Sequence, residues 1–200
     1  YRARLLSGEA VVVKVQRPGL RRQMTADLQL LESLAQLIEQ NEALAVYQPR
    51  QMVRQLAKAM LEELDFTQEG QNCDSVAHNF AQVPYIVIPH IYWPFSSQRL
   101  LVQAFLPSFT PLTREVLTAQ GLDPSLLAQR GAQAFIKMLL EDGLFHGDPP
   151  PGNLRAMSEN RVGFIDFGMV GRLDERRRIE VMNFMRALTE GSTETLVGVL

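Results

Sequence analysis

The chain has 200 residues, of which 46% are hydrophobic and 21% are charged, a composition typical of a folded globular protein. The net charge is −2 and the isoelectric point is about 6.0, so bulk electrostatics give no reason to expect nucleic acid as the main partner. The single cysteine, Cys73, excludes an intrachain disulfide and a multi-cysteine zinc site. No charge-free apolar run approaches the ~20 residues that span a bilayer.

Two short basic runs stand out, at residues 21–22 and 176–178. We interpret both as solvated helix faces, with contact to a membrane surface as the alternative. The chain starts with Tyr1 rather than Met, and it ends inside an apolar pattern, at residues 193–200. We therefore expect a piece of a longer protein.

The first third of the chain predicts two strands followed by two helices. The strands flank a turn at Ser7–Gly8–Glu9, and Pro18–Gly19 ends the second of them. Apolar residues at helical spacing then predict a helix over residues 24–40. A second helix is predicted over residues 49–72, and its later part is rich in acidic residues.

The remaining elements predict an α+β fold. In chain order they are strands at 85–88 and 99–105, helices at 112–119 and 124–142, a β-hairpin over 153–166 and a helix over 174–189. This order predicts two lobes, residues 1–106 and a mostly helical 107–200, with a hinge near residues 104–108.

Lys14 lies within the strand VVVKV, where alternate side chains share one face. Val12 and Lys14 therefore point one way, and Val11, Val13 and Val15 the other. A lysine in a buried strand costs free energy unless an anion, such as a phosphate or a carboxylate, meets it. The alternative is a lysine on an edge strand that reaches water.

Three oxygen-bearing side chains follow one another between residues 145 and 168, in FHGDPPPGNLRAMSENRVGFIDFG. Asp148 and Asn153 are separated by a proline-rich loop, and Asp166 follows the predicted hairpin. Each alone can be a turn former or a helix cap. Together they offer the hard oxygen ligands that Mg²⁺ prefers, and a carboxylate that can deprotonate an attacking hydroxyl.

Four motifs in a fixed order carry a resemblance to a known family. They are VVVKVQRPGL, ELDFTQEGQN, FHGDPPPGNL and FIDFGMVGRL. The chain resembles the ABC1/UbiB/ADCK family of atypical protein-kinase-like proteins over nearly its whole length. The resemblance implies a two-lobed protein-kinase-like fold with a mostly helical C-lobe.

The resemblance also implies a role for each matching residue. Lys14 would contact the α- and β-phosphates of ATP, with Glu69 as its partner on a helix. Asp148 would occupy the position of the catalytic base, and Asn153 and Asp166 would hold Mg²⁺. Val12 would form part of the adenine pocket.

Further family elements match in part. Glu63 and Asp65 resemble the family's E-x-D element, which interacts with an N-terminal K-x-G-Q segment, and His146 matches a histidine of the catalytic loop. The K-x-G-Q segment, the first strands and the alanine-rich loop that covers the phosphates do not occur in the chain. We therefore expect a truncated N-lobe.

Three positions depart from the pattern. Pro150 replaces a histidine of the family's loop, which keeps the loop rigid but removes a polar side chain. Ala104 stands at the hinge where an acidic residue is common. Gly147 follows His146, and no lysine lies two residues after Asp148, unlike in ordinary protein kinases. The last departure weakens the expectation of a protein substrate.

The resemblance thus implies an atypical kinase or ATPase that uses Mg-ATP and supports ubiquinone biosynthesis or other isoprenoid-lipid metabolism. It would lie in the cytoplasm or an organelle, peripheral to a membrane, where a lipid or a quinone intermediate is a candidate partner. One alternative is a non-catalytic nucleotide-binding regulatory scaffold, and another is a lipid-binding interaction protein.

Overall fold

The chain contains both strands and helices and divides into two compact units. The computed structural model describes residues 1–62, 64–109, 112–147 and 151–190. The first unit comprises Tyr1–Gln71 and Ile91–Ala104. The second comprises Asn72–His90 and the chain from Phe105 onward. The assignment of residues 1–106 and 107–200 to two kinase lobes stays a prediction.

The first unit contains a three-stranded antiparallel sheet in the order β1-β2-β4. Its strands are β1 (Arg2–Arg4), β2 (Ala10–Val15) and β4 (Leu100–Ala104). The turn between β1 and β2 contains the predicted Gly8, whose φ of 107° requires a glycine. The predicted β-hairpin at the start of the chain is thus confirmed.

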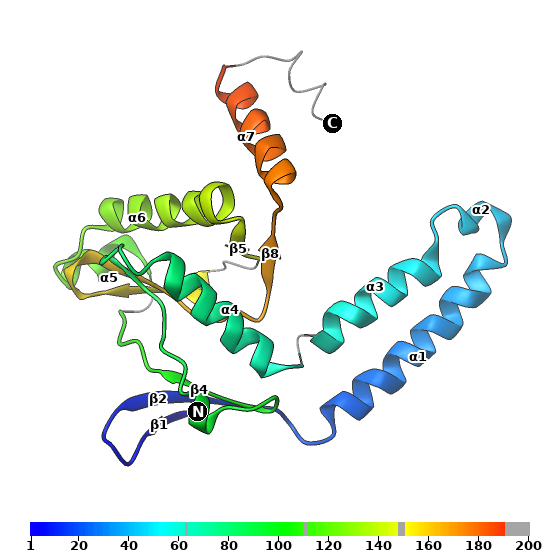
Figure 1. Ribbon diagram of the computed structural model, residues 1–200, viewed down its shortest axis with the longest axis horizontal. Helices are drawn as coiled ribbons and strands as arrows, with labels where there is room; N and C mark the ends of the chain where they lie inside the picture. Colours follow the sequence, from blue (N-terminus) through cyan, green and yellow to red (C-terminus); the bar gives the residue numbers. More distant parts are fainter. Residues whose placement is uncertain (63, 110–111, 148–150, 191–200) are drawn as a thin grey trace. The chain divides into compact units, whose positions relative to one another are not determined.

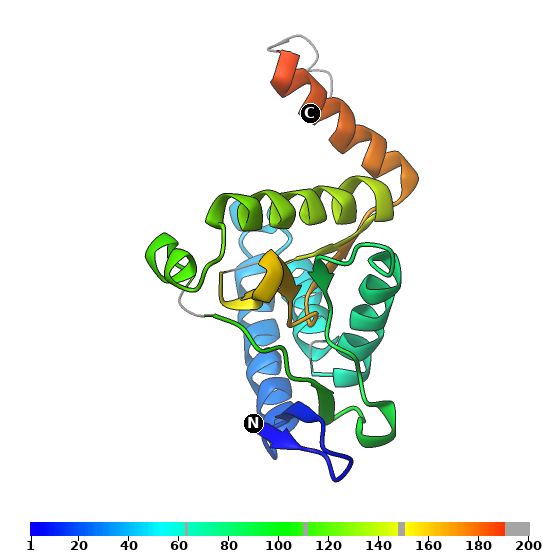
Figure 2. The ribbon, with the colours of Figure 1, turned by 90° about the vertical axis from the view of Figure 1, so that its left-hand side faces the viewer.

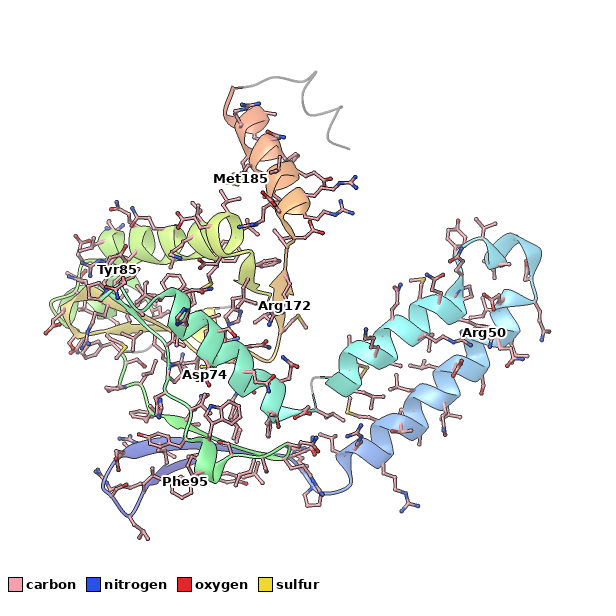
Figure 3. The ribbon with its side chains drawn as sticks, viewed as in Figure 1. Arg50, Asp74, Tyr85, Phe95, Arg172 and Met185 are labelled. Carbon is pink, nitrogen blue, oxygen red and sulfur yellow. The ribbon has the colours of Figure 1, made fainter. Side chains whose placement is uncertain are left out.

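A helical hairpin follows the sheet along the chain. Helices α1 (Leu20–Glu39) and α3 (Pro49–Glu62) run antiparallel side by side, joined by the short α2 (Glu42–Ala45) (Figure 1). Arg50 reaches from α3 to Glu39 of α1 in an ion pair of 3.7 Å (Figure 3).

The apolar stripe of α1 is only partly buried. Leu28 and Ala35 are buried against α3, whereas Leu34 and Leu37 are 55% and 62% exposed. Leu28 and Ala35 are seven residues apart, so they lie on the same side of the helix. Leu34 and Leu37 lie outside that face and remain exposed.

The helix predicted over 49–72 is wrong in its extent, because two helices occupy this segment. α3 ends at Glu62, and α4 runs over Phe66–Asn79. Between them the carbonyl of Leu64 accepts a hydrogen bond from the side chain of Gln16 on β2's flank, at 2.8 Å. Asp65 then caps α4, accepting a backbone N–H from its first turn at 2.9 Å.

The second unit contains two small sheets. The first has the order β3-β7-β6, with β3 (Ile86–Val87) parallel to β7 (Arg161–Phe164) and β6 (Leu154–Met157) antiparallel to it. The second pairs β5 (Leu144–His146) with β8 (Val170–Arg172). The predicted hairpin over 153–166 is confirmed, because β6 and β7 enclose its turn.

The second unit also contains helical segments. They include α5 (Arg114–Ala119), α6 (Pro124–Ile136), η2 (Lys137–Asp142) and α7 (Glu175–Glu190). α6 packs on β7 (Figure 2). The predicted helix over 124–142 is present but changes from α to π geometry at Lys137. Within the π segment Lys137 Nζ binds Asp142 Oδ1 at 2.6 Å.

The second unit has the larger described core. Its fully buried apolar side chains include Cys73, Val76, Met138, Phe164 and Phe167. The core of the first unit contains Val11, Leu28, Ala35, Ile91, Leu101 and Val102. Within the ranges that the structure describes, no helix is both long and apolar enough to cross a membrane.

Candidate functional site

Lys14 and Glu69 meet in the first unit. Lys14 Nζ donates a hydrogen bond of 2.5 Å to Glu69 Oε1, which also makes the two side chains an ion pair. Lys14 lies on β2, opposite Leu101 on the neighbouring strand β4. Glu69 lies in the first turn of α4. The two residues are 55 positions apart, so the fold rather than local sequence joins them.

The pair is largely shielded from solvent on the side of Glu69. The Glu69 side chain is 7% exposed and that of Lys14 is 25% exposed. The cation neutralises a buried carboxylate, which would be costly alone. Glu69 also complements the positive end of the α4 dipole. Lys14 is thus the more exposed member of the pair.

Val12 shares its strand face with Lys14, two positions away, as the alternation predicts. It pairs with Gln103 of β4, and it is half-buried. Val11, on the opposite face, is completely buried. Ala104, the departure at the proposed hinge, ends β4 opposite Val11.

Asn153 and Asp166 flank the open end of the β6–β7 hairpin in the second unit. There the backbone N–H of Ile165 donates to the carbonyl oxygen of Asn153 at 3.0 Å. Asp166 therefore follows directly after the residue paired with Asn153. Asp166 has a φ of 65°, which is uncommon for a residue other than glycine and turns the chain sharply after β7. Both side chains are half-buried.

His146 supports the same segment from β5. The residue is 1% exposed, and its Nε2 lies 3.1 Å from the carbonyl oxygen of Ile165. Its ring centroid lies 5.3 Å from that of Phe167, which is also 1% exposed. His146 is thus a buried contact of the backbone before Asp166 and of the side chain after it.

Two predicted site residues, Asp148 and Glu63, lie outside the described residues, as does Pro150. Asp65, the other half of the E-x-D element, lies in the first unit and caps α4.

Asn72 is a residue whose role the sequence did not reveal. It is 2% exposed, and its Nδ2 donates to the carbonyl oxygen of Phe167 at 3.1 Å. Its Oδ1 accepts from Arg172 Nη2 at 3.3 Å, and Figure 3 labels Arg172 on β8. The available signal was its position in ELDFTQEGQN, three residues after Glu69, on the same side of α4.

Comparison with known families decides where the chain belongs. All of it, residues 1–200, matches the family described as the ABC1 atypical kinase-like domain. The chain belongs to the ABC1 family. The resemblance predicted from the four motifs is thereby confirmed, and with it the kinase-like, mixed α and β character of the fold.

Individual ABC1 relatives are similar along the whole chain. An uncharacterized Synechocystis protein is 34% identical over 202 residues, covering 100% of this chain and 34% of that protein. The chloroplastic protein ACTIVITY OF BC1 COMPLEX KINASE 7 of Arabidopsis thaliana is 30% identical over 190 residues, covering 95% of this chain and 27% of that protein. The chain thus spans about a third of the length of these relatives.

A solved structure shares the fold. The complex of Rv3197 with erythromycin, from Mycobacterium tuberculosis, matches with a TM-score of 0.77 and 24% sequence identity. The match covers 99% of this chain and 49% of that chain. At this identity the likeness concerns the fold alone.

Proposed function

We propose that this ABC1 domain is the nucleotide-handling part of an ATP-dependent phosphotransferase or ATPase. The observation that carries the proposal is the ion pair of Lys14 with Glu69, since a strand lysine held by a buried helix carboxylate is the arrangement that kinases use to position ATP. We assign residues 1–106 to the N-lobe of a kinase and residues 107–200 to its C-lobe.

The donor set of Asn153 and Asp166 fits Mg²⁺. An amide oxygen and a carboxylate oxygen are hard ligands, and Mg²⁺ keeps several waters when it bridges to substrate phosphates. Among the described residues no group of three or more His, Cys, Asp or Glu side chains forms a metal site. In this proposal the two protein ligands are completed by phosphate and water.

The remaining residues act by positioning and charge. When bound, Mg-ATP would supply the γ-phosphoryl group and the metal would neutralise its charge. Lys14 holds phosphate oxygens, and Val12 contributes to the wall of an adenine pocket. Asp148 accepts the proton of an attacking hydroxyl or water.

The acceptor in this proposal is a lipid or a quinone intermediate at a membrane surface. Support comes from the family resemblance and from the lack of a lysine two residues after Asp148. The protein would act in ubiquinone or isoprenoid-lipid metabolism, in the cytoplasm or an organelle, peripheral to a membrane. The chloroplastic relative supports an organellar setting.

The test is Mg-dependent ATP hydrolysis by the full-length protein, measured with and without anionic liposomes. Asp166→Asn and Asp148→Asn are compared with the unchanged protein. Turnover that is lost in both variants supports the proposal. Nucleotide binding without turnover, unaffected by Asp148→Asn, overturns it in favour of a regulatory scaffold. Liposome binding that does not depend on nucleotide, again without turnover, favours a lipid-binding protein.

A further inference from the structure

A cavity lies in the first unit, where β2 ends and α1 begins. Figure 1 shows this connection between the strand and the helix. The cavity has a volume of about 1020 Å³. It is lined by residues 15–19, by one side of the first three turns of α1, by residues 64–65 and by residues 98–99. Lys14, Glu69 and Val12 do not line it, so it is separate from the proposed nucleotide contacts.

Four arginines line this cavity, which we name the arginine pocket: Arg17, Arg21, Arg22 and Arg99. All four are exposed, and none of them forms an ion pair with a described residue. By contrast, the neighbouring Arg54 of α3 binds Glu32 of α1 at 3.2 Å. Asp65 is the one acidic residue of the lining, so four positive charges face one negative charge.

The backbone at the start of α1 adds to this positive potential. Gly19 precedes the helix with a φ of 79°, and it has no side chain to cap the free N–H groups. The first turn contains no acidic residue, and the backbone N–H groups of Arg21 and Arg22 donate to no described residue. Arginines here oppose the helix dipole, so the chain alone gains nothing from them.

An anion would reverse this unfavourable balance. It would accept the free N–H groups at the start of α1 and would pair with the arginine side chains. The cavity is much larger than one phosphate and lies at the upper end of the volumes usual for small-molecule sites, about 300–1,000 Å³. Gln16, Gln29 and Gln98 supply further polar groups along its wall.

We propose that the arginine pocket binds a ligand with two or more phosphate groups, at a site distinct from that of the nucleotide. One phosphate lies at the start of α1 against Arg21 and Arg22, and another is within reach of Arg17 and Arg99. The ligand is a free diphosphate compound or the phosphate headgroup of a lipid. In this proposal the basic run at 21–22 is part of a specific phosphate site, rather than a solvated helix face or a general contact with a membrane.

The first test measures binding of inorganic pyrophosphate to the full-length protein by titration calorimetry. The variant Arg21→Gln/Arg22→Gln should bind it about tenfold or more weakly, because two charge-assisted contacts are lost. Arg176→Gln/Arg177→Gln makes the same change of charge on exposed α7 and should leave the affinity unchanged. Equal weakening in both double variants would overturn the proposal.

Two further variants test whether the binding site includes residues outside α1 and whether it differs from the proposed nucleotide site. Arg99→Gln lies outside α1 and should weaken binding in the same direction, and an unchanged affinity contradicts a pocket that spans both elements. Lys14→Met should still bind pyrophosphate. Loss of ATP binding with retained pyrophosphate binding in Lys14→Met therefore separates this site from the proposed nucleotide site.

A vesicle arm distinguishes the two sources of phosphate. Vesicles of phosphatidylcholine alone are compared with vesicles that also contain phosphatidic acid. Binding to the latter that is lost in Arg21→Gln/Arg22→Gln assigns a lipid headgroup. Pyrophosphate binding without vesicle binding assigns a free ligand. If neither probe binds at low ionic strength, where screening is weakest, the proposal is wrong.

Discussion

Asn72 and Phe167, 95 positions apart, are joined by a hydrogen bond of 3.1 Å from the Asn72 side chain to the Phe167 carbonyl oxygen. Both residues are almost completely buried. The bond fixes the backbone directly after Asp166, which is one of the two proposed metal ligands. Arg172 in turn donates to Asn72, so the asparagine is held from both ends of its amide.

We expect Asn72→Leu to lower the free energy of unfolding by about 1–3 kcal/mol, because it leaves a buried carbonyl oxygen without its donor. Urea denaturation measures the change. His78→Gln, on an exposed position of the same helix, is the control and should have little effect. Arg172→Gln should cost less than Asn72→Leu, since Arg172 is exposed. If Arg172→Gln lowers the free energy of unfolding more than Asn72→Leu does, the hydrogen bond from Asn72 to Phe167 is not the more important of the two.

Lys14→Met should reduce ATP turnover of the full-length protein by roughly 10²–10³-fold, the usual effect of removing one group that stabilises a transition state by charge. Glu69→Gln should reduce turnover in the same direction, because it removes the charge that holds Lys14. Lys58→Met is a matched control on exposed α3. Unchanged turnover in Lys14→Met would be incompatible with the proposed site.

Gly171→Ala and Gly131→Ala should change stability in opposite directions. A Cβ at Gly171 would overlap the ring of Phe145, its cross-strand partner, so we expect a loss of about 1–3 kcal/mol. Gly131 lies in α6 with no atom within 4 Å of such a Cβ. Alanine there should add about 0.5–1 kcal/mol through helix propensity. Shifts of the denaturation midpoint test both signs.

Glu180 provides a prediction on pH. Hydrogen bonds from Arg177 and then Arg176 lower the pKa of its carboxyl group below the usual 4.5. Since the folded-state pKa is depressed, the stabilisation is present above the unfolded value and is lost as the pH falls through the folded value. Carboxyl-carbon NMR titration should show this low pKa, and Arg176→Gln/Arg177→Gln should raise it towards 4.5. A pKa of Glu180 that is the same in both proteins would contradict the pairing.

The motifs and the short-range patterns were predictable from the sequence. Strand alternation placed Val12 and Lys14 on one face, and the residues around Glu159 and Asn160 marked the turn of the β6–β7 hairpin. Both of these turn residues have a positive φ, of 63° and 55°. A turn of this kind depends on neighbouring residues, so it can be predicted from the local sequence.

The break between α3 and α4 could not be predicted in this way, because the apolar spacing continues through it. The break depends on Leu64, whose carbonyl binds a glutamine side chain 48 positions earlier. The role of Asn72 was hidden for the same reason, since its partner Phe167 is far away along the chain. Contacts of this kind require the fold, whereas caps and turns require only their neighbours.

The π-helical segment η2 changes which acidic residue pairs with Lys137. Lys137 binds Asp142, five positions on, at 2.6 Å, and lies 3.9 Å from Glu141, four positions on. Five is the spacing at which a π-helix closes its hydrogen bonds, and four is that of an α-helix. The segment thus has the character of a single-residue insertion in an ordinary helix. Deletion of Leu140 would bring the same two charges to the α spacing, so an ABC1 relative with a regular helix here should align with a gap of one residue.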